Sequence, residues 1–275
     1  MNLFPFRRRK ARRQPERRVA SGPAGSRCYA IGDVHGCIDQ LADLLGQIGT
    51  DHLKRGSDAK AYVVLLGDLI DRGPDSRGVV ELLRNQPLAG LQFVFLAGNH
   101  EEFLLRILDG ESWLLPNWLQ YGGLACAHSY GVDVAAMLDS TDDEAMTAML
   151  RGHIPDEHVS FLRGFGDGFR FGDYLFVHAG IRPGVPIDEQ AVDDLRWIRE
   201  DFLDFEEDHG VVVVHGHTIC DEPDEQFNRI GIDTGAYRTG RLTAIGIEGE
   251  ERWFLSAHRG EAERSFRWGE WRQRR

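Results

Sequence analysis

The sequence predicts an α/β fold, in which β-strands alternate with helices along the chain. Short apolar runs of strand length recur through the 275 residues, and apolar residues at helical spacing follow several of them. Five of these runs end in a polar, glycine-containing loop that carries Asp, His or Asn. Because ligands of open α/β sheets bind beyond the carboxyl ends of the strands, we expect a functional site at these loops.

The elements before residue 111 form successive β-α-β units. They are, in order, a strand at 28–31, an amphipathic helix at 37–49, a strand at 62–66, a helix from Val79 that stops before Pro87, a strand at 93–97 and a helix that closes near Gly110. Residues 111–171 interrupt this pattern with a Gly122-Gly123 break and a capping-box pattern at Thr141 and Glu144. We expect a helical insertion there that forms a wall over one end of the sheet.

Strands resume after this insertion. The remaining predicted elements are strands at 174–177, 211–214, 229–232, 242–247 and 252–255, with a helix around 188–205 before the second of them. We expect three regions in the whole chain: a disordered basic arm at 1–27, a catalytic domain at 28–256 and a basic tail of unassigned structure at 257–275.

Charge is unevenly spread along the chain. The net charge is −12, but residues 1–27 carry +8 and the rest carries −20, which argues against broad nucleic-acid binding by the domain. Residues 7–18 of the arm suit contact with an anionic membrane or nucleic acid, and a solvated tail without a fixed partner is the alternative.

Several features favour a cytoplasmic location. No apolar run approaches the ~20 residues that span a bilayer, and the N-terminus has no apolar signal core. The four cysteines form no CxxC pair, so we expect reduced thiols rather than a disulfide framework.

The loops after the strands carry a set of oxygen and imidazole side chains without a thiolate. The set is Asp33, His35, Asp68, Asn99, His178 and His217. Such ligands favour Mn, Fe or Zn over a cysteine-built structural site, and six suit two metals with Asp68 as the bridge. Two divalent ions activate a water and clamp a phosphate. A structural His or a capping Asp explains any one loop, but explains the whole set poorly.

These residues occur in five motifs that also resemble a family. The motifs are Gly-Asp-Val-His-Gly at 32–36, Gly-Asp-Leu-Ile-Asp-Arg-Gly at 67–73, Gly-Asn-His-Glu at 98–101, Val-His-Ala-Gly at 177–180 and Gly-His-Thr at 216–218. In sequence and order they resemble the phosphoprotein phosphatases of the calcineurin-like metallophosphoesterases, over roughly residues 28–250. The compact bacterial and phage serine/threonine phosphatases are the most similar.

The resemblance implies a four-layer α/β/β/α sandwich with two mixed sheets and a dinuclear metal site at the carboxyl ends of the strands. Asp33, His35 and Asp68 would hold the first metal. Asp68, Asn99, His178 and His217 would hold the second. Mn²⁺ is the expected ion, with Fe or Zn as alternatives. His215 could compete with His217, and the motif register favours His217.

The resemblance also implies the remaining catalytic roles. His100 would protonate the leaving alcohol, with Asp71 orienting it, as a histidine held by a carboxylate can near neutral pH. Arg72 and Arg199 would grip the phosphate, which a hydroxide bridging the two metals would attack directly. Tyr237 would line the site, although a plain loop tyrosine is an equal interpretation.

The expected activity is hydrolysis of phosphomonoesters, with a phosphorylated protein or peptide as substrate, at serine or threonine and in a dual-specificity variant at tyrosine. The alternative is a symmetrical dinucleoside tetraphosphate or another small phosphoester. That class tends to lack the Asp71-Arg72 pair and to have Asp where Glu101 stands. A scaffold without activity would have lost a ligand, and none is missing.

Overall fold

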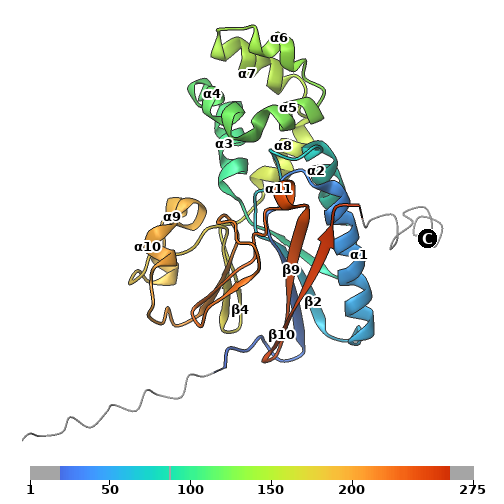
Figure 1. Cartoon of the computed structure of the whole chain (residues 1–275), viewed down its shortest axis with the longest axis vertical. Helices are drawn as coiled ribbons and strands as arrows, with labels where there is room; N and C mark the ends of the chain where they lie inside the picture. The colour runs from blue at the N-terminus through green and yellow to red at the C-terminus, as the bar shows by residue number, and fades with distance from the viewer. Residues whose placement is uncertain (1–18, 87, 261–275) are drawn as a thin grey trace, which may run out of the picture.

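The structure consists of two mixed β-sheets packed face to face, with helices on both outer faces (Figure 1). This computed structural model describes residues 19–86 and 88–260. The first sheet contains, in spatial order, β10 (Glu251–His258), β9 (Arg241–Glu248), β1 (Ser26–Ile31), β2 (Lys60–Leu65) and β3 (Gln92–Phe95). The second contains β4 (Phe169–Phe171), β5 (Tyr174–Phe176), β6 (Val212–His215), β8 (Arg229–Gly231) and β7 (Asp224–Glu225).

The first sheet is parallel on one side and antiparallel on the other, whereas the second has a parallel centre with antiparallel strands at both edges. β1, β2 and β3 are parallel, and β9 joins β1 antiparallel. β5, β6 and β8 are parallel, while β4 and β7 pair antiparallel with β5 and β8. The carboxyl ends of the parallel strands therefore lie at one end of both sheets, which brings their loops together.

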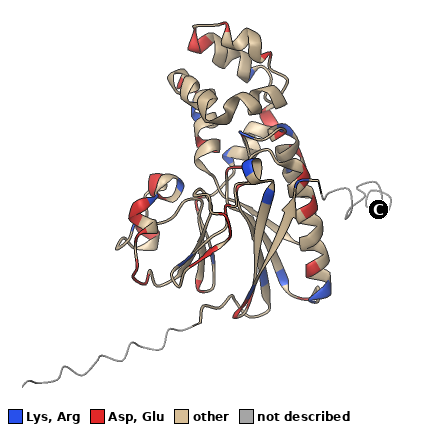
Figure 2. Cartoon of the chain, viewed as in Figure 1, with Lys and Arg blue, Asp and Glu red and all other residues tan. Residues whose placement is uncertain are grey.

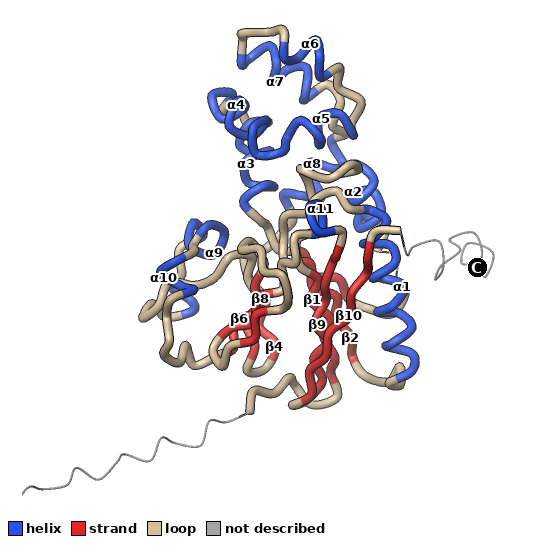
Figure 3. The backbone as a smooth tube through the Cα atoms, viewed as in Figure 1, coloured by secondary structure: helices blue, strands red, loops and turns tan. Residues whose placement is uncertain are grey.

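Three apolar layers hold these elements. The helices α1 (Ile38–Lys54), α2 (Ser76–Arg84) and α3 (Asn99–Leu108) bury their apolar faces on the first sheet. A second cluster fills the space between the sheets, and a third packs α9 (Val192–Trp197) and α10 (Glu200–Leu203) on the second sheet. The predicted α/β/β/α sandwich with two mixed sheets is confirmed (Figure 3).

A group of short helices rises above the sheets (Figure 1). It comprises η1 (Ser112–Leu114), α4 (Leu115–Trp118), η2 (Leu119–Gly123), α5 (Leu124–Ser129), α6 (Val134–Leu138), α7 (Asp143–Arg151) and α8 (Asp156–Arg163). We call residues 112–163 the helical segment. Two expectations were wrong here. Asp142 caps α7 in place of Thr141, because its carboxylate accepts the first free N–H groups. Residues 169–171 form β4 instead of helix.

The helix expected at 188–205 is broken into η3 (Ile187–Glu189), α9 and α10. Ile198 has an extended backbone with ψ of 144°, and Arg199 precedes α10 as its N-cap. The break follows Arg196, whose guanidinium reaches Asp167 at 2.6 Å. Arg196 thus ties the end of α9 to a distant loop, and Arg199 stands at the break.

The expected boundaries of the terminal regions also need correction. Arg27 was assigned to a disordered arm, but it lies in β1 and is 1% exposed. Its guanidinium binds Glu248 and donates to the carbonyls of His52, Arg55 and Gly56 at the end of α1. β10 extends to His258, past the expected boundary. The basic arm at 7–18 and the tail at 261–275 lie outside the described residues.

Acidic side chains are prominent on α9 and α10, in line with the negative charge of the body (Figure 2). Across residues 19–86 and 88–260, no helix has both the length and the apolar character that crossing a bilayer requires.

Candidate metal centre

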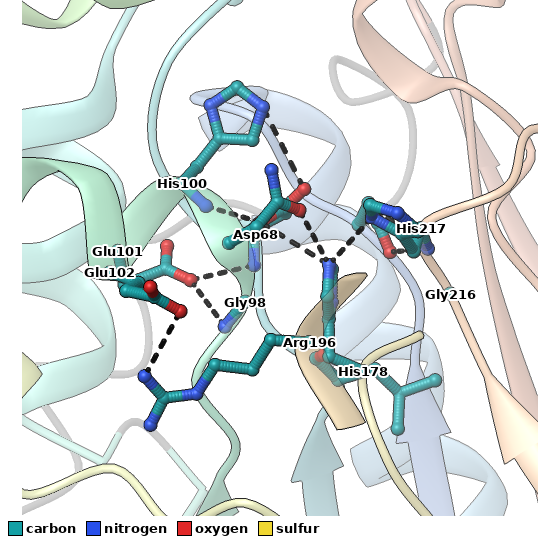
Figure 4. Close-up of polar contacts among 12 residues, drawn as sticks. Asp68, Gly98, His100, Glu101, Glu102, His178, Arg196, Gly216 and His217 are labelled. Atoms are coloured by element: carbon teal, nitrogen blue, oxygen red, sulfur yellow. Dashed lines mark hydrogen bonds and ion pairs between the residues drawn. The ribbon is translucent and has the colours of Figure 1, made fainter. Parts of the chain in front are cut away.

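The loops at the carboxyl ends of the parallel strands converge on Asp68, which follows β2 (Figure 4). All six predicted ligands are buried, and the most exposed of them, His217, is 8% accessible. Two groups of ligand atoms form within the described chain, each with its atoms inside 4.8 Å of one another: His35, Asp68 and His100, and Asp68, His178 and His217. Asp68 belongs to both groups, but the first group contains His100 where Asp33 was expected, and Asp33 is in neither group.

The backbone at the centre is strained in a way that aims these side chains inward. Among the described residues, six that are not glycine have a positive φ, and five of these belong to the site. They are His35, Asp68, Asp71, Arg72 and His217, with φ values from 44° to 72°. Left-handed backbone is costly for such residues and tends to gather at functional sites.

Glu101 holds the loops after β2 and β3 together. Its carboxylate accepts the N–H groups of Asp68 and Leu69 at 2.8 Å and of Gly98 at 2.9 Å. Burial and the nearby charge of Asp68 raise the pKa of Glu101 to about 7. The sequence prediction placed Glu101 in a motif but gave it no role, because an acid in the first turn of a helix is an ordinary capping residue.

His35 and His178 each present a ring nitrogen to a different one of the two ligand groups. His35 Nδ1 donates to the Ile70 carbonyl at 2.7 Å, and His178 Nδ1 donates to the Leu66 carbonyl at 2.8 Å. The tautomers that these hydrogen bonds select leave each Nε2 free to accept. Burial lowers the pKa of His35 to about 3 and also lowers that of His178, so both imidazoles are neutral, as metal ligands must be.

Several nitrogen and oxygen atoms lie close together around His178 Nε2. His178 Nε2 lies 3.2 Å from His217 Nδ1 and 3.1 Å from Asn99 Oδ1. Asp68 Oδ1 lies 3.5 Å from His178 Nε2. Such a cluster of lone pairs fits a bound cation, and the mixture of nitrogen and oxygen donors fits a divalent transition metal.

Crowded carboxylates supply a second reason for cations. Burial, together with the charges of Asp233 and Asp68, raises the pKa of Asp33 well above its usual range. Burial also raises the pKa of Asp233 to about 6, and its Oδ2 has no hydrogen-bond partner. Divalent ions would offset this repulsion. Asp233 follows β8, so its position at a sixth strand end was the sequence signal for a role that the prediction overlooked.

His100 and Asp71 form the expected pair. His100 Nδ1 lies 2.6 Å from Asp71 Oδ2, and His100 Nε2 lies 3.9 Å from Asp68 Oδ2. Burial works against a charged imidazole, but Asp68 and Asp71 outweigh it and raise the pKa of His100. A histidine held in this way can carry a proton to a leaving oxygen.

The phosphate-binding candidates flank this pair. Arg72 Nη1 lies 2.8 Å from His35 Nε2, and its guanidinium lies 5.1 Å from the Tyr237 ring. Arg199 donates to Thr218 Oγ1 at 3.2 Å, beside the loop of His217. His215 is apart from both ligand groups and packs its ring edge-on against Phe202, at 5.1 Å between centroids.

The fold and this centre define a class of metal-dependent phosphoesterase, and comparison with known proteins agrees. The family model of the calcineurin-like phosphoesterases matches residues 26–238, more than half of the chain, so the chain belongs to this family.

Two curated relatives and one crystal structure give further detail. The asymmetrical bis(5'-nucleosyl)-tetraphosphatase PrpE of Halalkalibacterium halodurans is 26% identical over 235 residues, or 78% of this chain and 87% of the relative. The symmetrical bis(5'-nucleosyl)-tetraphosphatase of Aromatoleum aromaticum is 31% identical over 156 residues, or 57% of this chain and 45% of the relative. A crystal structure described as a candidate diadenosine tetraphosphatase has a TM-score of 0.59 at 22% identity, covers 88% of this chain and 100% of its own, and supports the fold.

Proposed function

We propose that the protein hydrolyses dinucleoside tetraphosphates in a reaction that depends on divalent metal ions. The observation that carries the chemistry is the pair of ligand groups that share Asp68. The choice of substrate is supported by the two relatives, which are named as bis(5'-nucleosyl)-tetraphosphatases. The protein-phosphatase activity expected from the motifs becomes the second candidate.

Each residue of the centre has a defined task in this proposal. Asp33, His35 and Asp68 would hold one ion, and Asp68 with Asn99, His178 and His217 the other. Bound divalent ions would activate water and polarise the phosphate, with Mn²⁺ as the proposed metal. Arg72 and Arg199 would bind phosphate oxygens through their guanidinium groups. His100, held by Asp71, would donate a proton to the leaving oxygen.

The direct experiment is incubation with diadenosine tetraphosphate and Mn²⁺, followed by chromatography of the products. Symmetrical cleavage gives ADP alone, and asymmetrical cleavage gives AMP and ATP in equal amounts. We expect turnover that stops on chelation and returns when metal is added. Absence of both product patterns from protein that retains bound metal would contradict this substrate.

The second candidate, a phosphoprotein phosphatase, is favoured by one observation. Asp71 contacts His100 and Arg72 contacts His35 at the centre, which fits the roles that the resemblance to that family implies. A phosphoserine peptide tested beside diadenosine tetraphosphate decides between the two. The proposal predicts a higher kcat/KM for the dinucleotide, and a clear preference for the peptide would reverse the order of the candidates.

A further inference from the structure

Trp118, in the helical segment, makes a contact that the reaction scheme above does not use. The residue is fully buried, and its indole Nε1 donates to Asp71 Oδ2 at 2.8 Å. His100 Nδ1 lies 2.6 Å from the same oxygen. Trp118 is 47 positions from Asp71 in the sequence, so the contact comes from the fold.

Asp71 has few other restraints on its side chain. Its Oδ1 is buried and has no hydrogen-bond partner, and its backbone has a left-handed φ of 72°. The carboxylate is therefore oriented by two donors that meet at one oxygen. Removing the indole N–H would leave the imidazole of His100 as the donor to Oδ2, with the Cys126 thiol as another polar group near the carboxylate, and a buried carboxylate with one fewer partner is freer to turn.

The indole itself is firmly placed. Its ring packs so closely against Gly123 that a Cβ built on this glycine would come within 2.2 Å of it. The preceding residue, Gly122, contacts Arg72: its carbonyl accepts the backbone N–H of Arg72 at 3.0 Å. The helical segment thus contacts both Asp71 and Arg72. In the proposed reaction Asp71 orients His100 toward the leaving group, and Arg72 binds the phosphate.

From these contacts we infer that Trp118 is a positioning residue, which holds Asp71 so that Asp71 keeps His100 aimed at the leaving oxygen. The inference rests on the proposed hydrolysis of phosphoesters by this centre. If so, the helical segment has two roles: it forms a wall beside the site, and it also helps to position the catalytic groups. The alternative is a purely structural role, in which Trp118 only fills the apolar core.

The variant Trp118→Phe separates these roles, because it keeps most of the ring packing and removes the N–H. We expect unchanged metal content and a fall in kcat of about 10- to 100-fold for an alkyl phosphate, which needs a proton on its leaving oxygen. The loss should be smaller for p-nitrophenyl phosphate, whose leaving group is stable as an anion. Trp113→Phe is the matched control, since Trp113 is 63% exposed.

A double variant supplies the second readout. If Trp118 acts through His100, then Trp118→Phe should cause no further loss in protein that already carries His100→Asn. Equal losses for alkyl and aryl substrates, or additive losses in the double variant, would overturn the inference. If Trp118→Phe fails to fold, benzothienylalanine at position 118 keeps the shape of the indole without its N–H.

The two proposals can fail separately. Hydrolysis of the simple phosphates without any cleavage of diadenosine tetraphosphate would reject the proposed substrate and leave the Trp118 measurements valid. No hydrolysis of any phosphoester by metal-loaded protein would reject both.

Discussion

Asp68 is the residue on which the contacts of the centre depend. Its Oδ1 accepts the backbone N–H of His100 at 3.1 Å and lies 3.5 Å from His178 Nε2, while its Oδ2 lies 3.6 Å from His35 Nε2. Burial favours a neutral acid here, but the surrounding histidines lower the pKa of Asp68 below its usual range. The Asp68 carboxylate therefore lies between the imidazoles of both ligand groups.

The substitution Asp68→Asn should remove metal as well as activity, because it takes away the negative charge that both positions share. Metal content measured by atomic emission should fall sharply in protein purified with Mn²⁺. Asp39→Asn, which alters an exposed acid on α1, should retain its metal. Full metal content in Asp68→Asn would refute the shared-ligand assignment.

His100→Asn should lower kcat by about 100- to 10,000-fold for alkyl phosphates and leave the metals bound. The reason is that asparagine cannot supply the proton that the leaving oxygen requires. The measurement is a plot of rate against the pKa of the leaving group, which should be steeper in the variant than in the parent protein. Parallel plots would argue that His100 has another role.

Among single residues, the sequence predicted the site residues that directly follow an apolar strand. The six expected ligands and His100 all lie at such positions, and the parallel strands bring them together. Trp118 could not be predicted, because its contact with Asp71 depends on how the helical segment folds back. Glu101 was visible in its motif, but its four backbone partners come from two different loops.

At the scale of elements, α1 and the helical segment each make a contact that can be tested. Arg27 reaches from β1 to the last carbonyls of α1. A cation there interacts favourably with the negative end of the helix dipole. Gly122 lies where the helical segment meets Arg72, with a φ of +115° and no room for a side chain.

Replacing Arg27 by Met should lower the free energy of unfolding by about 3 kcal/mol, because Glu248 and the carbonyls of α1 lose a buried partner. Urea denaturation measures this change. Arg84→Met is the control, since its pair with Glu81 lies at the surface and should contribute about 0–1 kcal/mol. Equal effects of the two changes would contradict the role of Arg27.

Gly122→Ala should raise KM by on the order of tenfold, because the new methyl group would lie 2.6 Å from Arg72 Cγ and 2.8 Å from Arg72 N. Steady-state kinetics with p-nitrophenyl phosphate tests this. Gly110→Ala separates crowding from backbone strain, since Gly110 has a similar φ of +108° but open space around it. An equal rise in KM in both variants would point to backbone strain alone.

Most elements could be predicted from apolar periodicity, since strands and helices bury one face each. The helix expected at 188–205 could not, because its break follows a contact between Arg196 and Asp167, which lies on a distant loop. β4 and β7 have three and two residues, too short to show alternation.

For the whole molecule, metal binding and stability are linked. The ligands come from both sheets, so ions at the centre would join the two layers that otherwise meet through apolar packing. An ion that binds the folded state alone stabilises it by an amount that grows with its concentration.

Chelation should therefore lower the melting temperature of the whole chain. At an ion concentration of 100 times Kd the stabilisation is about 2.7 kcal/mol, which calorimetry in Mn²⁺ and then in a chelator resolves. Re-addition of Mn²⁺ should restore the original transition. Asp68→Asn serves as the reference, since its melting temperature should respond little to either treatment.

The pairing of β1 with β9 also has a consequence for biosynthesis. Ile31 lies opposite Ala244, so β1 must wait for a strand that is synthesised long after it. Until then, one edge of β1 stays open beside the growing chain, and such edges invite pairing with other chains. His217 likewise emerges long after Asp33. We therefore expect a nascent chain to complete its metal centre only after the loop of His217 has been synthesised.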